Sequence, residues 1–452
     1  MPDYTVPGIL VQEIEGPIIG ALTTSSRTIA LLGETQGGVS GVERARASAT
    51  VTLSTANIVK ESIKVFKEAT GEAYTLTTDY AIEQTGKETK IKPVAAKIPN
   101  DTDLKVTFLS VPDNYYDATI FTATEDLAER FGPAFKATGE VNSPLTLAGQ
   151  LAFVNGASSI LAVAVKKTGA AVKPSDFEEA LAKVSGERVS IIVPVTDASS
   201  IKAQVSAHVT RNSANGAERR AILGLDGTVS SVTSETRKTA AESIRNARVL
   251  LVSPSAISLY VSTANNTVTV GGQYVAAALA GLASSLGPAI PLTRKSIVGF
   301  QSIPRQEAPA VRDLETQSGV TTLEQAANGS IRVRHGVTTD PSSLTTREWS
   351  IVGQRDAMVS AVRDTLDNDG IIGSLIDSLT LSNVKASVDT ALQGLVNAGT
   401  ILSYTDLKVR QSPSQPDHVE VRFAWRASVP MNYVVVRYAL NITSGSLETT
   451  EN

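Results

Sequence analysis

Alternation of apolar and polar residues is clearest near the C-terminal end of the chain. Two alternating runs, at 407–410 and 419–426, flank a polar loop that contains Pro413 and Pro416. Strict period-2 alternation predicts strands with one buried face and one solvent-exposed face, and the short loop predicts that the two strands form a β-hairpin. The apolar positions of this hairpin are Leu407, Val409, Val419, Val421, Phe423 and Trp425.

A third alternating run follows Val429-Pro430, and its apolar face holds Val434, Val436, Tyr438, Leu440 and Ile442. A strand at the end of a chain has unpaired edges, and such edges pair readily with another chain. The N-terminal end has a similar extended segment between Pro7-Gly8 and Gly16-Pro17, with Ile9, Leu10, Val11 and Ile14 as its apolar residues. These termini suit strand exchange between subunits, and folding back onto their own domain is the alternative.

Apolar runs alternate with helical patterns through the middle of the chain. Strands are expected at 28–32, 159–165, 189–193, 220–225 and 248–252, with helices at 145–155, 198–210, 233–246 and 275–286. This βαβα order predicts a parallel or mixed sheet with flanking helices. Thr122 and Ser175 are each followed by Glu three residues later, which predicts helix N-caps at both positions.

The segment 45–118 differs in composition from the rest of the chain, because it is rich in Thr, Lys, Glu and Val. Its pattern predicts a small all-β insertion with strands at 57–59, 73–76 and 104–109. Towards the C-terminus, strands are expected at 331–334 and 347–352. Two helices follow, one with Met358, Val362 and Leu366 on one stripe and one over 384–398 that ends at Gly399. Both helices are expected to pack on the hairpin.

Composition narrows the possible classes. A chain of 452 residues is too long for one core and should hold about three domains. The net charge is −4, with 41 basic and 45 acidic residues and no basic run, which argues against nucleic-acid binding. Cysteine is absent, and the start lacks the features of a signal peptide. The apolar helix at 275–286 is too short to span a bilayer, so a soluble protein without membrane partners is expected.

No constellation of residues predicts catalysis, a metal site or a cofactor. The segment 33–40 has P-loop glycine spacing, but Val39 occupies the lysine position. The turn 224–227 lacks G-x-G-x-x-G, and 367–370 lacks the twelfth-position Glu of an EF-hand, where Ser378 stands instead. His208, His335 and His418 lie in separate segments, and Trp349 and Trp425 are expected to be core anchors. We therefore expect a protein that is not an enzyme.

Four segments together resemble a known family. Pro7–Ile14 is similar to the "PGVYVEE" opening of the contractile tail sheath proteins of bacteriophages, and Thr28–Thr35 resembles the strand that follows it there. Thr122–Gly132 resembles the family's "S..D....FG" segment, and the region from Ile331–Thr339 to Pro430–Val434 resembles its C-terminal domain. The order of these segments carries more weight than any one of them.

The resemblance implies a structural subunit of a virion tail, assembled in the host cytoplasm into stacked six-fold rings around a tail tube. It implies contacts with the tube, baseplate and tail terminator proteins, and contraction that drives the tube through the host envelope without ATP. Both terminal segments would join the hairpin of a neighbouring subunit, with Gly16, Pro17 and Pro430 as hinges. Arg355, Arg363 and Lys385 are candidate tube-facing residues from family position and charge.

The expected fold class is a mixed α/β and α+β multidomain protein with extended terminal linking strands. The expected divisions are an N-terminal arm (1–20), a sheath core part (21–44 and 119–173), the β-rich insertion (45–118), an α/β middle domain (174–310), a C-terminal domain (311–432) and a linking strand with tail (433–452). Bacteriocin-like and secretion-system sheaths are near alternatives. An α/β enzyme or small-ligand-binding protein that uses 174–255 is the alternative of a different class, because fold alone does not decide function.

Overall fold

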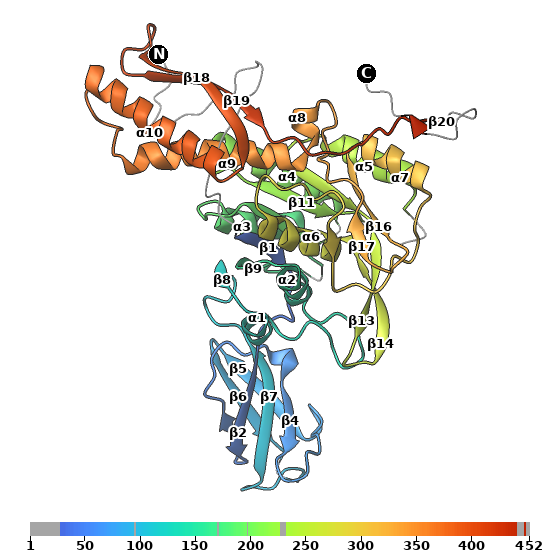
Figure 1. Ribbon diagram of the computed structural model, residues 1–452. Helices are drawn as coiled ribbons and strands as arrows, with labels where there is room; N and C mark the ends of the chain where they lie inside the picture. Colours follow the sequence, from blue (N-terminus) through green and yellow to red (C-terminus); the bar gives the residue numbers. More distant parts are fainter. Residues whose placement is uncertain are drawn as a thin grey trace.

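The computed structural model describes residues 28–440, apart from 95, 170, 197 and 227–231, and residues 447–448. The molecule is elongated (Figure 1): a small β region lies at one end, a central α/β body follows, and a layer of helices and a hairpin lies at the other end. Within the described part of the chain, no helix has the length and apolar character needed to cross a membrane.

A nine-stranded sheet forms the centre of the body, in the order β15-β17-β16-β12-β11-β10-β1-β9-β8. Pairing from β16 to β9 is parallel, whereas β8, β17 and β15 pair antiparallel to their neighbours. Parallel strands covered on both faces are apolar throughout, which explains the continuous apolar runs. The strands are β1 (Ile29–Gly33), β8 (Thr119–Phe121), β9 (Ile160–Ala164), β10 (Ile191–Val195), β11 (Arg220–Gly224), β12 (Val249–Ser253), β15 (Ser296–Ile297), β16 (Val320–Gln325) and β17 (Ile331–Val333).

Helices cover both faces of this sheet, and alternate side chains of each strand belong to different cores. Ile29 and Leu31 of β1 lie in one core with α1 (Thr124–Phe131), α2 (Pro144–Val154) and α6 (Gly272–Leu286). Ala30 and Leu32 lie in the other core with α3 (Pro174–Val184), α4 (Ser199–Ala214) and α5 (Ser234–Ile244). The hairpin of β13 (Ala256–Val261) and β14 (Asn266–Gly271) packs on the first core, and α7 (Pro309–Gln317) lies beside β16.

The β region consists of two three-stranded antiparallel sheets, β2-β7-β4 and β3-β6-β5. Its own core includes Val65, Ile91, Leu104 and Val106, all fully buried. The elements are β2 (Val39–Arg46), β3 (Val51–Thr52), η1 (Lys60–Ser62), β4 (Lys64–Lys67), β5 (Tyr80–Thr85), β6 (Glu88–Pro93) and β7 (Asp103–Ser110). It begins six residues earlier than the expected insertion, because β2 pairs along its whole length with β7.

At the opposite end, two long helices and a hairpin share a third core. Val388, Leu392 and Leu395 are fully buried there, with Trp425 at 8% exposure. The elements are α8 (Leu344–Arg347), α9 (Trp349–Asn368), α10 (Ser378–Asn397), β18 (Ile401–Gln411) and β19 (Val419–Ala427), followed by the short pair β20 (Ala439–Leu440) and β21 (Leu447–Glu448). The predicted packing of both helices on the hairpin is confirmed, and Gly399 follows α10 with a φ of 67°.

Several local predictions were wrong. Residues 347–352 do not form a strand: they end α8 and begin α9, and Trp349 is buried under the Arg220 guanidinium, 4.0 Å from the ring centroid. Segments 57–59 and 73–76 form only isolated bridges. Thr122 and Ser175 are not N-caps, since α1 begins after Ala123 and α3 after Lys173.

The expected division of the body also differs from the structure. Strands β1 and β9 were assigned to a core part and β10 to a separate middle domain, yet β1 pairs with both β9 and β10. Strands β16 and β17, assigned to the C-terminal domain, extend the same sheet through β12. The sheet unites these segments because neighbouring parallel strands need not be neighbours in sequence.

Candidate interaction surface

The chain after β19 exposes an unusual concentration of apolar side chains. Met431, Tyr433, Val434, Val435, Val436 and Tyr438 are each between 72% and 84% exposed. No strand is assigned over 428–438, and Figure 1 shows this stretch as an extended connection across the top of the body. Contiguous exposed apolar surface usually marks an interaction site. Residues 433–438 of the predicted strand therefore have the composition of a strand but no partner strand in the described part of the chain, whereas Ala439 and Leu440 pair with β21.

The hairpin that precedes this segment is a two-stranded sheet. β18 and β19 pair with each other and with no other strand among the described residues. Val409 is opposite Val421, and Tyr404 is opposite Trp425. Leu407, Val409, Val419, Val421 and Phe423 are partly buried against the α9–α10 core. One face is thus covered by helices while both outer edges keep unpaired backbone groups, which is the arrangement that accepts an added strand.

The exit of the chain from the hairpin is fixed by Gln354 of α9, whose side chain is fully buried. Its Nε2 donates to the Ser428 carbonyl at 2.9 Å, and the Ser428 amide donates to its Oε1 at 2.8 Å. The side-chain amide thereby replaces a strand partner for this one residue. The direction in which the exposed segment leaves the body is set at this contact.

A second anchor lies four residues later, at Asn432. Its Nδ2 donates to Glu348 Oε1 at 3.1 Å, and the same oxygen lies 2.9 Å from His335 Nε2 and 3.4 Å from Arg347 Nε. Glu348 is 1% exposed, so these polar partners compensate for its burial. Pro430, the expected hinge, lies between the Ser428 and Asn432 anchors.

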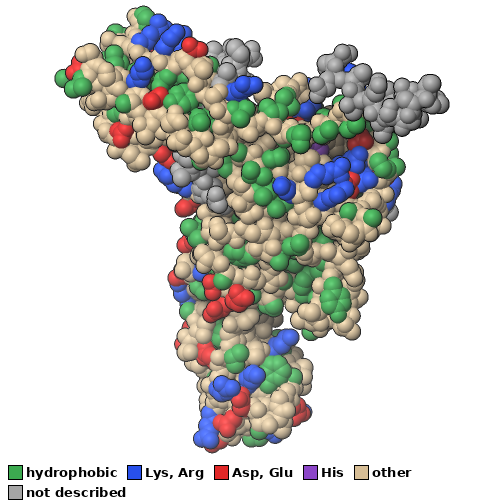
Figure 2. All heavy atoms as spheres, in the orientation of Figure 1, with side chains coloured by type: hydrophobic (Ala, Val, Ile, Leu, Met, Phe, Trp, Pro, Cys, Tyr) green, Lys and Arg blue, Asp and Glu red, His purple; other side chains and the backbone are tan. Residues whose placement is uncertain are grey.

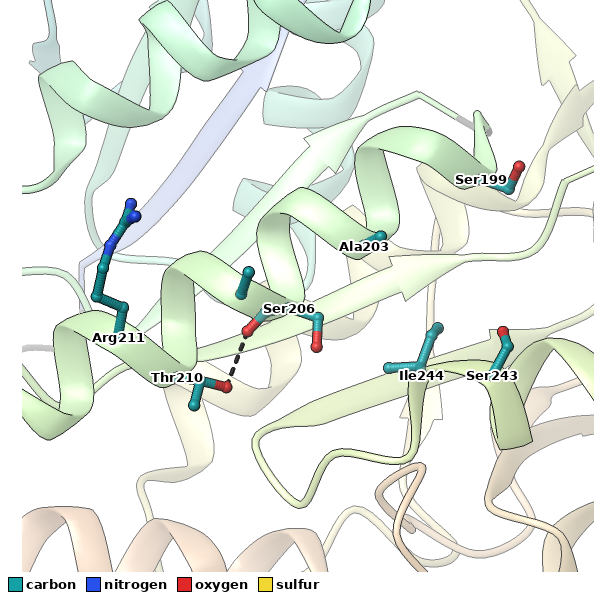
Figure 3. Close-up of a pocket in the computed structure, with 8 residues that line it drawn as sticks. Ser199, Ala203, Ser206, Thr210, Arg211, Ser243 and Ile244 are labelled. Atoms are coloured by element: carbon teal, nitrogen blue, oxygen red, sulfur yellow. Dashed lines mark hydrogen bonds between the residues drawn. The ribbon is translucent and has the colours of Figure 1, made fainter.

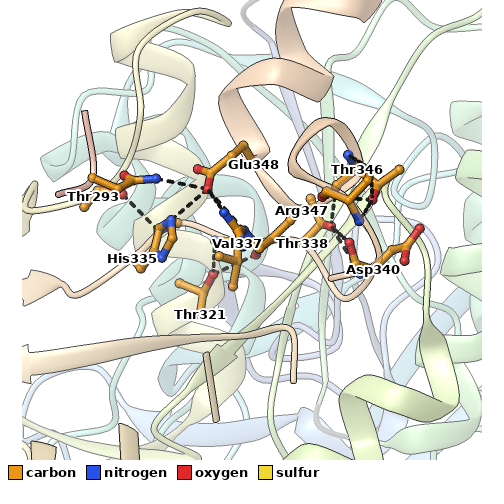
Figure 4. A network of polar contacts seen from close by, with 12 residues as sticks. Thr293, Thr321, His335, Val337, Thr338, Asp340, Thr346, Arg347 and Glu348 are labelled. Atoms are coloured by element: carbon orange, nitrogen blue, oxygen red, sulfur yellow. Dashed lines mark hydrogen bonds and ion pairs between the residues drawn. The ribbon is translucent and has the colours of Figure 1, made fainter. Parts of the chain in front are cut away.

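Residues 334–339, which belong to the segment Ile331–Thr339 that carried the family resemblance, connect the central sheet with this anchor. The Val337 amide donates to Thr321 Oγ1 at 2.9 Å on β16, and Val337 forms an isolated bridge with Glu348. The Thr338 amide donates to the Arg347 carbonyl at 2.7 Å. Figure 4 shows these residues as one continuous polar network, which ties the start of α9 to the sheet.

The candidate tube-facing residues do not form one cluster. Arg363 donates to both carboxylate oxygens of Glu218, at 2.7 and 3.0 Å, and to the Gly216 carbonyl at 2.7 Å. It therefore fastens α9 to the segment between α4 and β11. Arg355 is half-buried on the same helix, whereas Lys385 on α10 is exposed.

A cavity between α4 and α5 bears on the alternative ligand-binding hypothesis for the region 174–255. A cavity of about 620 Å³ lies between α4 and α5 (Figure 3), lined mainly by small residues such as Ser199, Ala203 and Ser206. Arg211 is its one charged lining residue, so the cavity offers no acid–base pair. Within the described ranges, no three His, Cys, Asp or Glu side chains gather as a metal site.

Some predicted site residues cannot be placed. Ile9, Leu10, Val11, Ile14, Gly16, Pro17 and Ile442 lie outside the described residues. Leu440 belongs to the short strand β20. Sequence reasoning did not find the two anchors, Gln354 and the Glu348–Asn432 pair, since a buried Gln or Glu inside a helical pattern carries no signal of its own.

Comparisons with known proteins agree with this architecture. The family model described as the phage tail sheath protein central domain matches residues 170–339. The chain is 40% identical over 429 residues to the tail sheath protein of Mycobacterium phage Bxz1, covering 92% of this chain and 73% of that protein. It is 28% identical over 283 residues to the tail sheath protein of Bacillus phage SP01, covering 62% of this chain and 48% of that protein.

Solved structures show the same fold at low sequence identity. The helical sheath of the anti-feeding prophage in the contracted state matches with a TM-score of 0.59 at 10% identity, over 97% of this chain and 100% of that chain. The sheath complex of an extracellular contractile injection system, PVC, in the contracted state matches with a TM-score of 0.58 at 10% identity, over 98% and 99%.

The 40% identity to the Bxz1 protein, over 92% of this chain, shows that the two proteins are related in sequence and do not only share a fold. The expected role as a structural subunit without enzymatic activity is thereby confirmed, as is the expected family. The chain belongs to the phage tail sheath protein family and is a structural subunit of a contractile tail.

Proposed function

We propose that copies of this chain assemble into stacked six-fold rings that form a helical sheath around a tail tube in the virion. Contraction of this sheath drives the tube through the host envelope, and the sheath is built in the host cytoplasm. Baseplate and tail terminator proteins contact its two ends. The exposed apolar segment 433–438, next to a hairpin with two open edges, is the observation that carries this proposal.

In the proposed assembly, the segment that follows Asn432 adds as a strand to the hairpin of a neighbouring copy. Val434, Val436, Tyr438, Leu440 and Ile442 then cover apolar surface, and Ile9, Leu10, Val11 and Ile14 of another copy join the other edge. Main-chain hydrogen bonds satisfy the open edges, and each fully buried large apolar side chain contributes about 1.5–3 kcal/mol. Such links hold the polymer together while the subunit bodies move.

The anchors define where the link pivots. Pro430 lies between two held residues, so rotation there requires the Asn432–Glu348 contact to break, whereas rotation at Tyr433 leaves both anchors intact. Gly16 and Pro17 are the proposed hinges of the N-terminal arm. For the tube contact, exposed Lys385 is the foremost of the three candidates, since Arg363 is engaged by Glu218 and Arg355 is half-buried.

Two deletions test the linking-strand proposal. Chains that lack residues 1–16 or 434–452 should remain folded by circular dichroism but form no striated tubes or stacked rings in negative-stain electron microscopy. The full chain at rising concentration serves as the reference. Tubes of normal length from either deletion would contradict the proposal.

Point variants test whether the deletions act by removing an added strand or only by shortening the chain. The double variant Val434→Ser/Val436→Ser removes two side chains from the face that should be buried, so tube formation should fall sharply. Val435→Ser is the matched control on the opposite face, where alternation predicts exposure in the polymer as well. Equal effects of the two variants would argue against an ordered strand.

A further inference from the structure

Four arginines surround a single carboxylate at the β16–β17 edge of the sheet. Glu324 Oε1 accepts from Arg294 at 2.6 Å and Arg332 at 2.8 Å, and Oε2 accepts from Arg334 at 2.8 Å and Arg312 at 3.3 Å. Burial raises the pKa of Glu324, but hydrogen bonds from Arg332 and Arg334 outweigh it, so the pKa lies below its ordinary value. Glu324 is therefore ionised at neutral pH.

The single carboxylate of Glu324 cannot neutralise the charge of the four arginines. Asp313 pairs with Arg334 at 2.7 Å, which leaves four guanidinium groups against two carboxylates, a surplus of two positive charges. Neighbouring Lys295 is exposed and forms no ion pair with another described residue, so the surplus becomes three. We call Arg294, Lys295, Arg312, Arg332 and Arg334 the basic cluster.

The basic cluster is accessible as well as unbalanced. The side chains of Arg294 and Arg332 are 58% and 36% exposed, while Arg312 is 8% exposed and its Nε is buried without a hydrogen-bond partner among the described residues. Figure 2 shows Lys and Arg side chains gathered over this edge of the sheet. A strand edge that concentrates charge around one buried carboxylate is built to receive further anionic groups.

A matching anionic surface lies on α1 of the same chain. Glu125, Asp126 and Glu129 are exposed, and none of them forms an ion pair with another described residue. Glu125 and Glu129 are four residues apart on one helix, where like charges repel each other. Figure 2 shows acidic side chains over α1, lower in the view than the basic cluster.

We infer that the basic cluster of one copy docks on the acidic face, Glu125, Asp126 and Glu129, of a neighbouring copy. The two surfaces are different and lie on different elements, so the contact is heterologous and repeats from copy to copy, as a ring or helix requires. This inference rests on the proposed polymerisation. It adds a second intersubunit contact, between the bodies, to the strand exchange at the hairpins.

Charge reversal on each surface, followed by their combination, tests the docking. Arg294→Glu/Lys295→Glu reverses the exposed part of the basic cluster but leaves three arginines to neutralise Glu324. Glu125→Lys/Asp126→Lys/Glu129→Lys reverses the acidic face. Each variant should raise the protein concentration needed for tubes by about tenfold or more, the equivalent of about 1.4 kcal/mol. The chain that carries all five changes should assemble close to the unmodified level.

Controls separate this inference from the proposed function. Lys60→Glu/Lys64→Glu makes the same change of charge as Arg294→Glu/Lys295→Glu, at two exposed residues of the β region, and should leave assembly unchanged. Thermal unfolding verifies that each variant is folded. If the unmodified chain forms no polymer, the proposed function fails. If it polymerises and a folded reversal variant does so equally well, or the five-fold variant is not restored, docking between these two surfaces is wrong.

Discussion

At the scale of single residues, His208 on α4 is held in an environment that disfavours its charge. It is 3% exposed, and its Nε2 lies 3.4 Å from Arg219 Nη1. Burial lowers its pKa to about 4, and the charges of Arg219 and Arg211 add to this effect. Because a guanidinium only donates hydrogen bonds, Nε2 accepts, and the neutral ring carries its proton on Nδ1.

This environment predicts acid sensitivity. A folded-state pKa below the unfolded value of about 6.5 means that the stabilisation is complete above that pH and is lost as pH falls towards about 4, at about 1.4 kcal/mol per unit. Between about pH 7 and pH 5 the unmodified chain should lose about 2 kcal/mol more unfolding free energy than His208→Gln. Urea unfolding at both pH values measures the difference.

The control for this prediction is His418→Gln. His418 lies in the exposed loop of the hairpin beside Asp417, so this variant measures the effect of losing a histidine that is not buried. Identical slopes for His208→Gln and the unmodified chain would show that other groups dominate the acid response.

Residue-level prediction from the sequence failed where two signals competed. Ser175 with Glu178 matched the capping pattern, but Pro174 occupies the first turn and Asp176 accepts from the Lys173 amide at 2.8 Å. Proline at the first helical position was the better signal, since its missing N–H costs nothing there.

At the scale of elements, replacing two helical glycines by alanine should change the stability of the fold in opposite directions. A Cβ on Gly281 of α6 would lie 2.1 Å from the Ala152 carbonyl oxygen of α2, whereas a Cβ on Gly394 of α10 would meet nothing within 4 Å. Gly281→Ala should therefore destabilise the fold by about 1–3 kcal/mol through overpacking. Gly394→Ala should stabilise it by about 0.5–1 kcal/mol through lower unfolded-state entropy. Denaturant unfolding of both variants measures the two changes in the free energy of unfolding.

The anchor at Gln354 yields a prediction for the hairpin. Gln354→Ala leaves the Ser428 amide and carbonyl without their partners, which should cost on the order of 2 kcal/mol and speed exchange of the Ser428 amide hydrogen. Gln393→Ala is the matched control, because its side chain is exposed and donates to Asn397 of the same helix. Unchanged exchange at Ser428 would mean that the anchor does not hold the exit of the chain.

Element types were predictable where the periodicity was unambiguous. The apolar runs of β1, β9 and β10 and the alternation of β18 and β19 were read correctly, because burial on both faces or on one face leaves different patterns. At 347–352 the residues Trp349, Ile351 and Val352 fit a strand as well as the first turns of a helix. Their place in α9 is decided by tertiary contacts with the Glu348 network and Arg220.

At the scale of the whole molecule, the β region should behave as an independent unit. Val39 pairs with Ser110, so the two ends of the region lie side by side, and its core is separate from the others. We expect residues 38–111 to fold alone with a cooperative thermal transition, and the rest of the chain to keep its fold when a short glycine linker replaces them. Calorimetry of both pieces tests this, and a fragment without a cooperative transition would contradict it.

Long-range arrangement was the part that the sequence could not provide. Strands β9 and β10 flank β1 from opposite sides, and nothing in their apolar runs encodes that order. The basic cluster shows the same limit: Arg294, Arg312, Arg332 and Arg334 are scattered along the chain, and only the pairing of β16 with β17 and the position of α7 direct them to one carboxylate. The net charge of the chain is only −4, so its composition gave no sign that basic side chains gather at this place.

In the proposed strand exchange, the anchor at Asn432 would also limit how far two linked copies can separate. Only Tyr433 lies between Asn432 and Val434, the first residue of the proposed added strand, so at about 3.3 Å per residue the two steps span at most about 7 Å. Breaking the contacts of Ser428 and Asn432 would release five more residues, 428–432, and lengthen the tether by about 16 Å. In the proposed assembly the two anchors would therefore set the maximum length of the link, because the spacing of neighbouring copies would depend on which anchor remains closed.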